Sequence, residues 1–310
     1  MSDEIQFNKT LDLAPGVVDE VVPGVRRLLA DNPGPFTFKG TLSYIVGRGK
    51  VAIIDPGPAD ERHIAALLDA VRGETVTHIV VTHTHRDHSP AAAPLKAATG
   101  AITLGEGPHR PARPLFVGET PRLDAGGDAS FAPDRRLAHG DVVAGEGFAL
   151  EAIATPGHTA NHMAFALKGT DVLFSGDHVM GWSTSIVAPP DGAMSDYMAS
   201  LRRLAARPET TYLAGHGDVI RDAPDYVAHV IRHRVGRETS ILHRLGEGEG
   251  ESESDIPALV RSIYVGLDPR LSGAAALSVL AHLEDLVARG LVATEDAAAP
   301  SIGSRYRLAD

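Results

Sequence analysis

The spacing of apolar residues predicts alternating strands and helices along the first part of the chain. Residues 42 to 55 contain two short β-branched runs around a Gly-Arg-Gly-Lys turn, which is the pattern of a hairpin. Apolar residues then recur at helical spacing over residues 61 to 72, and the apolar run at 76 to 81 is typical of a strand. A second helix and strand follow at 90 to 99 and 101 to 104. This alternation predicts an α/β fold.

Strand and helix patterns return after a long segment with little periodicity. Residues 105 to 135 carry several Gly and Pro residues, so we expect a long surface loop there. Such a loop serves as a lid or binding element when it is ordered, and a mobile insertion is an equal alternative. The strands expected after it are 148–154, 164–167, 172–175 and 211–214, with a helix at 196–206.

The last third of the chain has mainly helical spacing. A helix is expected from Ala223 through Leu245, and the acidic run at 246 to 255 predicts a flexible break after it. Helices at 256 to 265 and 274 to 289, with a short strand at 305 to 308, suggest a winged helix. We therefore divide the chain into a large domain, residues 1–235, and a small one, residues 236–310.

Composition agrees with two globular units and restricts their chemistry. The chain has 310 residues, of which 43% are hydrophobic and 22% are charged. Its formal net charge of -11 argues against a dedicated binder of duplex DNA, because the two polyanions repel each other. The chain has no cysteine, so any metal must be held by nitrogen and oxygen.

Localisation follows from what the sequence lacks. The first residues have neither the basic nor the apolar region of a signal peptide. We also find no run of about 18 apolar residues of the kind that crosses a bilayer. The sequence therefore predicts a cytoplasmic protein that has no membrane partner.

The strongest chemical signal is the segment Thr82 to Ser89, which follows the apolar strand at 76 to 81. It places three histidines and one carboxylate within six positions. Side chains alternate along extended backbone, so His83 and His85 point the same way and can share one metal. Asp87 and His88 then turn toward a second metal.

Further polar side chains stand at the ends of three later strands. Thr155-Pro-Gly-His158, Ser175-Gly-Asp177-His178 and Ala214-Gly-His216 each follow an apolar run. A single such residue is more often structural, because loops are polar in any case. Four strand ends carrying the same residue types favour one shared metal site.

In order and spacing, these residues resemble the five sequence motifs of the metallo-beta-lactamase superfamily. The resemblance covers roughly residues 40 to 220 and implies a four-layer αββα sandwich, here followed by a small, mainly helical winged-helix-like domain. It implies that Asp55 is a structural residue beside the metal ligands. The implied ligands of the first metal are His83, His85 and His158; those of the second are Asp87, His88 and His216; Asp177 bridges both.

The resemblance also implies a mechanism and a pair of cofactors. Nitrogen and oxygen ligands suit two divalent ions, with Zn²⁺ as the first choice and Mn²⁺ or Fe²⁺ as alternatives. Two ions about 3.5 to 4 Å apart can hold a bridging hydroxide and polarise the bond to be cut. Asp87 would then be the catalytic residue, since it is both a ligand and the group that orients the nucleophile. The expected activity is metal-dependent hydrolysis.

Within the superfamily, the chain is most similar to the lactamase-beta-2-like branch, which includes a single-strand endoribonuclease and carries a winged-helix-like domain. The supporting motifs are His-Arg-Asp-His-Ser, Pro-Gly-His-Thr and Ser-Gly-Asp. The chain departs from this branch at Gly40-Thr41-Leu42, where Gly-Thr-Asn is usual. It departs from beta-lactamases that use a cysteine ligand, because it has none. Four further residues are expected to contact substrate: His178, His233, Arg234 and Arg237.

Substrate class remains open between three hypotheses. Net acidity, and the absence of an extended basic or aromatic stripe, favour a small ester, thioester or lactone over single-stranded RNA. The third hypothesis is a DNA-binding regulator whose lactamase domain senses a ligand. Its recognition helix would be residues 282 to 289, where Glu284 and Asp285 are unsuited to phosphate contact. The C-terminal domain is therefore expected to cover the active site or to form a homo-oligomer contact.

Overall fold

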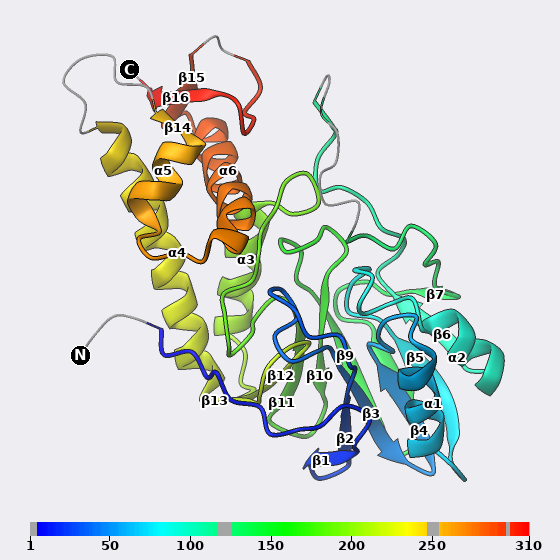
Figure 1. Cartoon of the computed structure of the whole chain (residues 1–310). Helices are drawn as coiled ribbons and strands as arrows, with labels where there is room; N and C mark the ends of the chain where they lie inside the picture. Colours follow the sequence, from blue (N-terminus) through cyan, green and yellow to red (C-terminus); the bar gives the residue numbers. More distant parts are fainter. Residues whose placement is uncertain (1–4, 117–118, 120–125, 247–253, 296–297, 310) are drawn as a thin grey trace.

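The computed structural model describes residues 5–116, 119, 126–246, 254–295 and 298–309. Two sheets lie face to face with helices outside them, and a smaller helical unit stands at one end (Figure 1). The long helix α4 (Ala223–Gly246) runs from the sandwich into this smaller unit.

The first sheet contains seven strands in chain order. The hairpin predicted at 42 to 55 is confirmed, because β3 and β4 pair antiparallel. The strands β4, β5 and β6 then pair in parallel, since the helices α1 and α2 carry the chain back between them. The elements are β1 (Asp19–Val22), β2 (Val25–Leu29), β3 (Leu42–Arg48), β4 (Lys50–Ile54), α1 (Glu61–Ala70), β5 (Thr75–Val80), α2 (Ala92–Thr99), β6 (Ile102–Gly105) and β7 (Arg135–Arg136).

The second sheet contains six strands in the order β13-β12-β11-β10-β9-β8. Its strands pair antiparallel except for β11 and β12, which run parallel because α3 connects them. The elements are β8 (Val142–Gly145), β9 (Phe148–Ala154), β10 (Met163–Leu167), β11 (Val172–Gly176), α3 (Met194–Ala205), β12 (Thr211–Ala214) and β13 (Ile220–Arg221).

Three hydrophobic clusters account for the layers. Residues from the inner faces of both sheets, among them Tyr44, Phe165 and Phe174, form the core between the sheets. A second cluster packs α3 and α4 on the second sheet, and a third packs α1 and α2 on the first. Because side chains alternate along each strand, one strand serves both an inner and an outer cluster. The predicted αββα sandwich is confirmed.

The C-terminal unit has a core of its own. The end of α4 packs there with the two following helices through residues such as Leu245, Leu259 and Leu283. A small antiparallel sheet in the order β14-β16-β15 completes the unit, as expected for a winged helix. The elements are β14 (Ser254–Asp255), α5 (Ile256–Ile263), η1 (Pro269–Leu271), α6 (Ser272–Ala288), β15 (Val292–Thr294) and β16 (Arg305–Leu308).

The boundary between the two units was predicted at residue 235. This residue lies inside α4, which continues without a break to Gly246. Residues 247 to 253 of the predicted acidic break lie outside the described residues. The exact division of the chain at residue 235 therefore stays a prediction.

Several elements have no counterpart in the sequence pattern. The strands β1, β2, β8 and β13 are short, and three of them contain charged residues: β1 reads Asp-Glu-Val-Val, β2 reads Val-Arg-Arg-Leu-Leu and β13 reads Ile-Arg. The buried Arg27 of β2 is paired with Asp19 and Asp218 at 2.8 Å each. An arginine neutralised in this way interrupts an apolar pattern without interrupting the strand.

One expectation about membranes needs correction. The stretch Pro269–Ala288, which covers η1 and α6, is long and apolar enough to cross a bilayer, although half of it is buried inside the molecule. Leu283 and Leu286 of α6 are fully buried in the core of the C-terminal unit. Burial in a protein core accounts for that half of the helix.

Candidate metal centre

Four strand ends of the sandwich bring the predicted ligands to one edge. His83, His85, Asp87 and His88 occupy the turn after β5, while the others follow β9, β11 and β12. The turn after β5 is compact, since the His88 and Ser89 amides both donate to the His85 carbonyl. All seven predicted ligands meet there, in two groups: His83, His85, His158 and Asp177 in one, and Asp87, His88 and His216 in the other.

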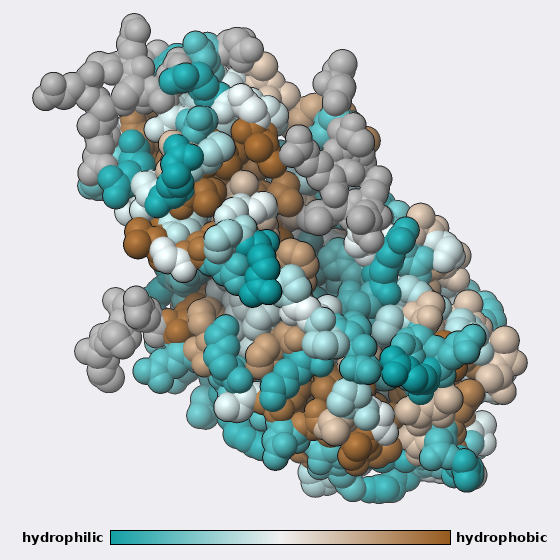
Figure 2. All heavy atoms as spheres, in the orientation of Figure 1, coloured by the Kyte–Doolittle hydropathy of each residue, from teal (hydrophilic) through white to brown (hydrophobic). Residues whose placement is uncertain are grey.

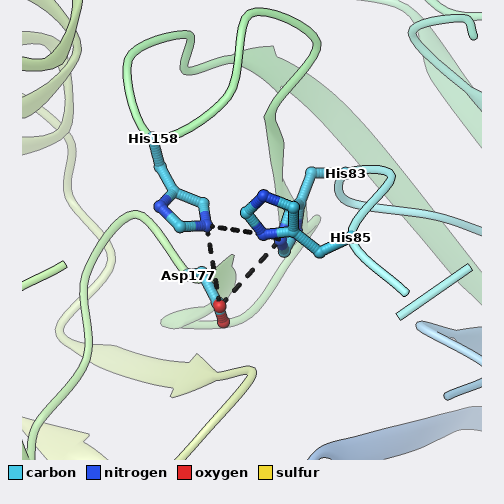
Figure 3. A group of neighbouring side chains, drawn as sticks. All are labelled: His83, His85, His158 and Asp177. Carbon is cyan, nitrogen blue, oxygen red and sulfur yellow. Dashed lines mark hydrogen bonds and ion pairs between the residues drawn. The ribbon is translucent and has the colours of Figure 1, made fainter. Parts of the chain in front are cut away.

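The first group consists of three imidazoles and a carboxylate (Figure 3). His85 Nδ1 lies 3.0 Å from His83 Nε2 and 3.1 Å from His158 Nε2. Asp177 Oδ2 lies 3.9 Å from His83 Nε2 and 3.8 Å from His158 Nε2. Four donor atoms facing one another at these separations can converge on a single ion.

The second group shares Asp177 with the first. Asp87 Oδ2 lies 3.3 Å from His88 Nε2 and 3.2 Å from His216 Nε2. Asp177 Oδ2 lies 3.5 Å from the same His88 nitrogen and 3.3 Å from that of His216. The Asp177 carboxylate therefore stands between the groups, as the resemblance implies for a bridging ligand.

The outer nitrogen of four imidazoles is held by an acceptor, which fixes the tautomer. The His158 Nδ1 lies 2.6 Å from the Ile186 carbonyl oxygen, and the His216 Nδ1 lies 3.0 Å from that of Gly40. The His88 Nδ1 lies 2.9 Å from Asp55 Oδ2. Since these oxygens accept, each Nδ1 carries the proton and each Nε2 keeps its lone pair for the centre.

Asp55 supports the ligand turn without joining either group. Its carboxylate accepts hydrogen bonds from the Thr82 amide and hydroxyl, both at 2.7 Å. Because the Thr82 hydroxyl donates to Asp55, it can only accept from His83 Nδ1, which lies 3.0 Å away. This places the His83 lone pair on Nε2, toward the first group. The structural position predicted for Asp55 agrees with these contacts.

Thr41 also contacts the Asp87 oxygen that faces His88 and His216. The buried Thr41 hydroxyl lies 2.8 Å from Asp87 Oδ2. Asn32 Nδ2 donates to the same hydroxyl at 2.9 Å, while Asn32 Oδ1 accepts from the Thr41 amide. The single Thr41 proton is thus directed to Asp87, so the carboxylate is held in one orientation.

Glycine is required where the backbone approaches this centre. A Cβ at Gly215 would lie 2.3 Å from Asp177 Oδ1 and 2.6 Å from His88 Cε1. Any larger residue would therefore displace members of both ligand groups.

Protonation differs between the two groups. Burial and the neighbouring imidazoles hold the pKa of His83 well below its usual value and lower that of His85 to about 3. Burial also acts against a charge on His216, but Asp177 and Asp87 outweigh it and raise the pKa of His216 to about 10. A cation bound to the second group would take the place of that proton.

The donor set fits divalent metal ions. His88 Nε2 and Asp177 Oδ1 are buried and have no hydrogen-bond partner among the residues that the structure describes. Unpartnered buried polar atoms are costly unless a bound group satisfies them. Imidazole and carboxylate ligands without sulfur suit Zn²⁺, Mn²⁺ or Fe²⁺.

A cavity of about 690 Å³ opens onto both groups. Besides several ligands, its walls contain residues that the sequence motifs did not indicate. Most are apolar or small, and some belong to the C-terminal unit. They are Phe36, Thr37, Arg86, Gly126, Met180, Ile186, Ala188, Asp191, Arg270, Gly273, Ala274, Ala276, Leu277 and Ile302.

The four residues expected to contact substrate lie elsewhere: none is part of this cavity wall. His178 is fully buried against Tyr197, with ring centroids 4.5 Å apart, and burial lowers its pKa to about 3. Arg234 is buried and donates to the Ser185 carbonyl. The hydroxyl of the same Ser185 lies 3.2 Å from His158 Nδ1.

The other two residues of that set lie on the half of α4 that leads to the C-terminal unit. Arg237 donates to the Ile263 carbonyl at 2.8 Å and stacks on Tyr264. His233 is partly buried, and burial lowers its pKa to about 4. Both are engaged in packing between helices, so contact with substrate stays a prediction for them.

The predicted loop at 105 to 135 is ordered where the structure describes it. His109 Nδ1 lies 3.0 Å from the Thr84 hydroxyl, and the Ala112 amide donates to the Pro190 carbonyl. Arg113 reaches the C-terminal unit, where its Nε donates to Glu284 Oε2 at 2.9 Å. These contacts hold residues 105 to 116 against both units, but none of these residues lines the cavity, so a role as a lid stays a prediction. Residues 117–118 and 120–125 lie outside the described part.

Comparison with known proteins agrees with this geometry. Residues 36–216 match the metallo-beta-lactamase superfamily, and residues 256–299 match the beta-lactamase associated winged helix domain. A beta-lactamase-like protein 2 homolog of Caenorhabditis elegans is 31% identical, with 77% of each chain covered. An atrochrysone carboxyl ACP thioesterase of Claviceps purpurea is 30% identical over 80% of this chain and 74% of its own.

A solved structure extends the likeness to the whole fold. The beta-lactamase domain protein of Burkholderia ambifaria superposes with a TM-score of 0.76 at 23% identity, and 96% of each chain is covered. Because nearly all of both chains is covered, the likeness includes the C-terminal unit as well as the sandwich. The family indicated by the sequence motifs is confirmed: the chain belongs to the metallo-beta-lactamase superfamily, as a metal-dependent hydrolase with an associated winged helix domain.

Proposed function

We propose that the chain hydrolyses a small ester-type substrate at two divalent ions, and that this substrate is a thioester. The observation that carries the proposal is the cavity of about 690 Å³, with ligand groups on one side and mainly apolar walls elsewhere. A volume of this size suits one small molecule. The name of the Claviceps purpurea relative, a carboxyl ACP thioesterase, supports the same class.

Two ions, which we propose to be Zn²⁺, would be held by the two groups with Asp177 facing both. When bound, they supply a nucleophile deprotonated near neutral pH and polarise the carbonyl oxygen. Asp87 is the residue that we propose orients the attacking group, since Thr41 holds its carboxylate in place. The apolar walls limit access of bulk water to the reacting bond.

A thioester also fits a cavity whose wall has few groups that could protonate the leaving group. A free thiol has a pKa of about 8.5, so a thiolate leaves with little help from a proton donor. Among the described wall residues, most carboxyl and imidazole groups belong to the ligand set, and Asp191 is the exception. An amide, whose nitrogen must be protonated to leave, would demand more of this site.

RNA fits the same cavity less well. A phosphate backbone needs cations, and the described wall offers Arg86 and Arg270. Arg270 is already paired with Asp268, with its Nη2 2.7 Å from Oδ2. The predicted recognition helix is also unsuited to DNA, since its Glu284 and Asp285 would repel a phosphate. Neither nucleic acid is therefore part of the proposal.

The test is hydrolysis of a parallel panel by zinc-loaded and manganese-loaded protein. The panel holds an N-acetylcysteamine thioester, a lactone, a carboxylic ester, a phosphodiester chromophore and single-stranded RNA. We expect turnover of the thioester to be fastest and to be lost in Asp87→Ala, with the metal content of each preparation measured in parallel. Cleavage of RNA or the phosphodiester alone would refute the proposal.

A further inference from the structure

Helix α6 carries more apolar surface than the core of its own unit uses. The stretch Pro269–Ala288 is as apolar as a membrane-crossing helix, yet only half of it is buried. Leu283 and Leu286 account for part of the buried half, within the core of the C-terminal unit. The apolar residues nearer the start of the helix have another environment.

That environment is the cavity above the ligand groups. Gly273, Ala274 and Leu277 lie on its wall, and their spacing places them on one face of the helix. Leu277 is partly exposed and belongs to none of the hydrophobic clusters found in the described chain. Figure 2 shows apolar atoms gathered on the C-terminal unit, where Figure 1 places α5 and α6.

The part of the cavity wall outside α6 also contains apolar residues that belong to no cluster. Phe36, Met180 and Ile186 also line the cavity and also lie outside the clusters of the described residues. Phe36 is 47% exposed although it is a large aromatic residue. Apolar side chains that line a cavity and lie outside the clusters that form the cores are typical of a ligand site.

The ligand groups indicate how a substrate would lie in the cavity. Asp177, which stands between the two groups, lines one end of the cavity and is only 6% exposed. The reacting group of a substrate would lie at this end. The rest of the substrate would then extend between the apolar walls.

We infer that α6 is the binding wall for the acyl group of the substrate, and that this group is bulky and apolar. The inference rests on the proposed function and assigns specificity to the winged-helix unit. Small residues on α6 leave room for the group: a Cβ at Gly273 would meet no atom within 4 Å. A larger side chain on this face would fill space that the acyl group occupies.

The test compares Ala274→Phe with the matched control Ala288→Phe. Both replace alanine by phenylalanine on α6, but Ala288 is exposed and is not part of the cavity wall. The substrates are the acetyl and decanoyl thioesters of N-acetylcysteamine. We expect wild type to prefer decanoyl, and Ala274→Phe to lower kcat/KM for decanoyl by about 10-fold to 100-fold, because removing room for several methylenes costs at least that much. Acetyl should change by about twofold or less, since it does not reach the wall.

A second measurement separates this inference from the proposed function. Binding of decanoate and acetate to the zinc-loaded protein is measured by calorimetry, which needs no turnover. If no thioester is hydrolysed but decanoate binds more tightly than acetate and loses that advantage in Ala274→Phe, the acyl wall stands and the proposed reaction fails. Equal affinity for both acids, or equal loss in Ala274→Phe and Ala288→Phe, would overturn the inference.

Discussion

The ligand side and the apolar side of the cavity are built in opposite ways. On the ligand side, several side chains are fixed by hydrogen bonds to groups outside the two ligand sets, as His216 is by the Gly40 carbonyl and His88 by Asp55. On the apolar side, Leu277 and its neighbours are placed only by the path of α6. The ligand side fixes the positions of individual donor atoms, whereas the apolar side fixes only the shape of the space.

This difference separates rate from selectivity. A hydrogen-bonded ligand has one useful position, so a substitution there removes a metal or misplaces it. An apolar wall tolerates changes of size, and each change alters which substrate fits. We expect substitutions on the ligand side to lower the rate for every substrate, and substitutions on α6 to change the ranking of substrates.

The largest expected effect comes from Asp177→Ala. Asp177 faces both groups, so its loss should remove metal from both and lower kcat/KM by at least about a thousandfold. Elemental analysis of the purified protein measures the metal directly. Asp191→Ala is the matched control, because Asp191 is also a buried carboxylate on the cavity wall. If Asp177→Ala keeps a full metal complement, Asp177 is not a bridging ligand.

A smaller effect should come from Thr41→Val. Valine keeps the shape but cannot donate to Asp87, so kcat should fall by about 10-fold to 100-fold with little change in KM. Thr41→Ser restores the hydroxyl and should recover most of the rate. A matching loss in both variants would show that packing of the methyl group, rather than the hydrogen bond, is what matters.

A smaller effect still is expected from breaking the ion pair between Arg113 and Glu284 of α6. Arg113 pairs with Glu119 and Glu284, and the side chains of Arg113 and Glu284 are 19% and 15% exposed. Arg113→Met leaves Glu284 without its cation, so we expect the free energy of unfolding to fall by about 1 to 3 kcal/mol. KM for bulky thioesters should rise several-fold. The double variant with Glu284→Gln should recover stability; if it does not, the ion pair is unimportant.

The last expected effect is absent at neutral pH and concerns the C-terminal unit. Burial, assisted by Arg234 and His233, lowers the pKa of His282 to about 3. In the unfolded chain His282 takes up a proton below about pH 6.5, whereas the folded protein does so only near pH 3. The stability that neutral His282 allows is therefore complete above pH 6.5 and is lost as pH falls toward 3.

The measurement is the free energy of unfolding of wild type and His282→Leu between pH 7.5 and 4. The difference should change by up to about 1.4 kcal/mol per pH unit below 6.5, in favour of the leucine variant. His282 has no hydrogen-bond partner for either ring nitrogen within the described residues, so the substitution itself breaks no bond. Parallel pH profiles of the two proteins would contradict the assignment.

The ligand side could be predicted from the sequence because its information is local. His83, His85, Asp87 and His88 lie within six positions, and every other ligand directly follows an apolar strand. The apolar side could not, because its residues come from distant segments and each looks like an ordinary core residue. Only the small, apolar start of α6, Gly273 to Ala276, hinted at a helix face kept open.

The predicted contacts at His178 and Arg234 show the same limit. A histidine or arginine near a motif can be buried in the protein or face a ligand, and the sequence does not say which. Here His178 packs on Tyr197, and Arg234 holds the Ser185 carbonyl. The strands β1 and β2 were missed for a related reason, since a paired Arg27 conceals an apolar pattern.

The length of helix α4 restricts how the two units can move relative to each other. Its 24 residues form one uninterrupted rod of about 36 Å that belongs to both cores. A helix of this length resists hinge bending, so the sandwich and the C-terminal unit should move together rather than apart. Access of substrate to the cavity should then depend on side chains of its wall, such as Phe36, which is 47% exposed.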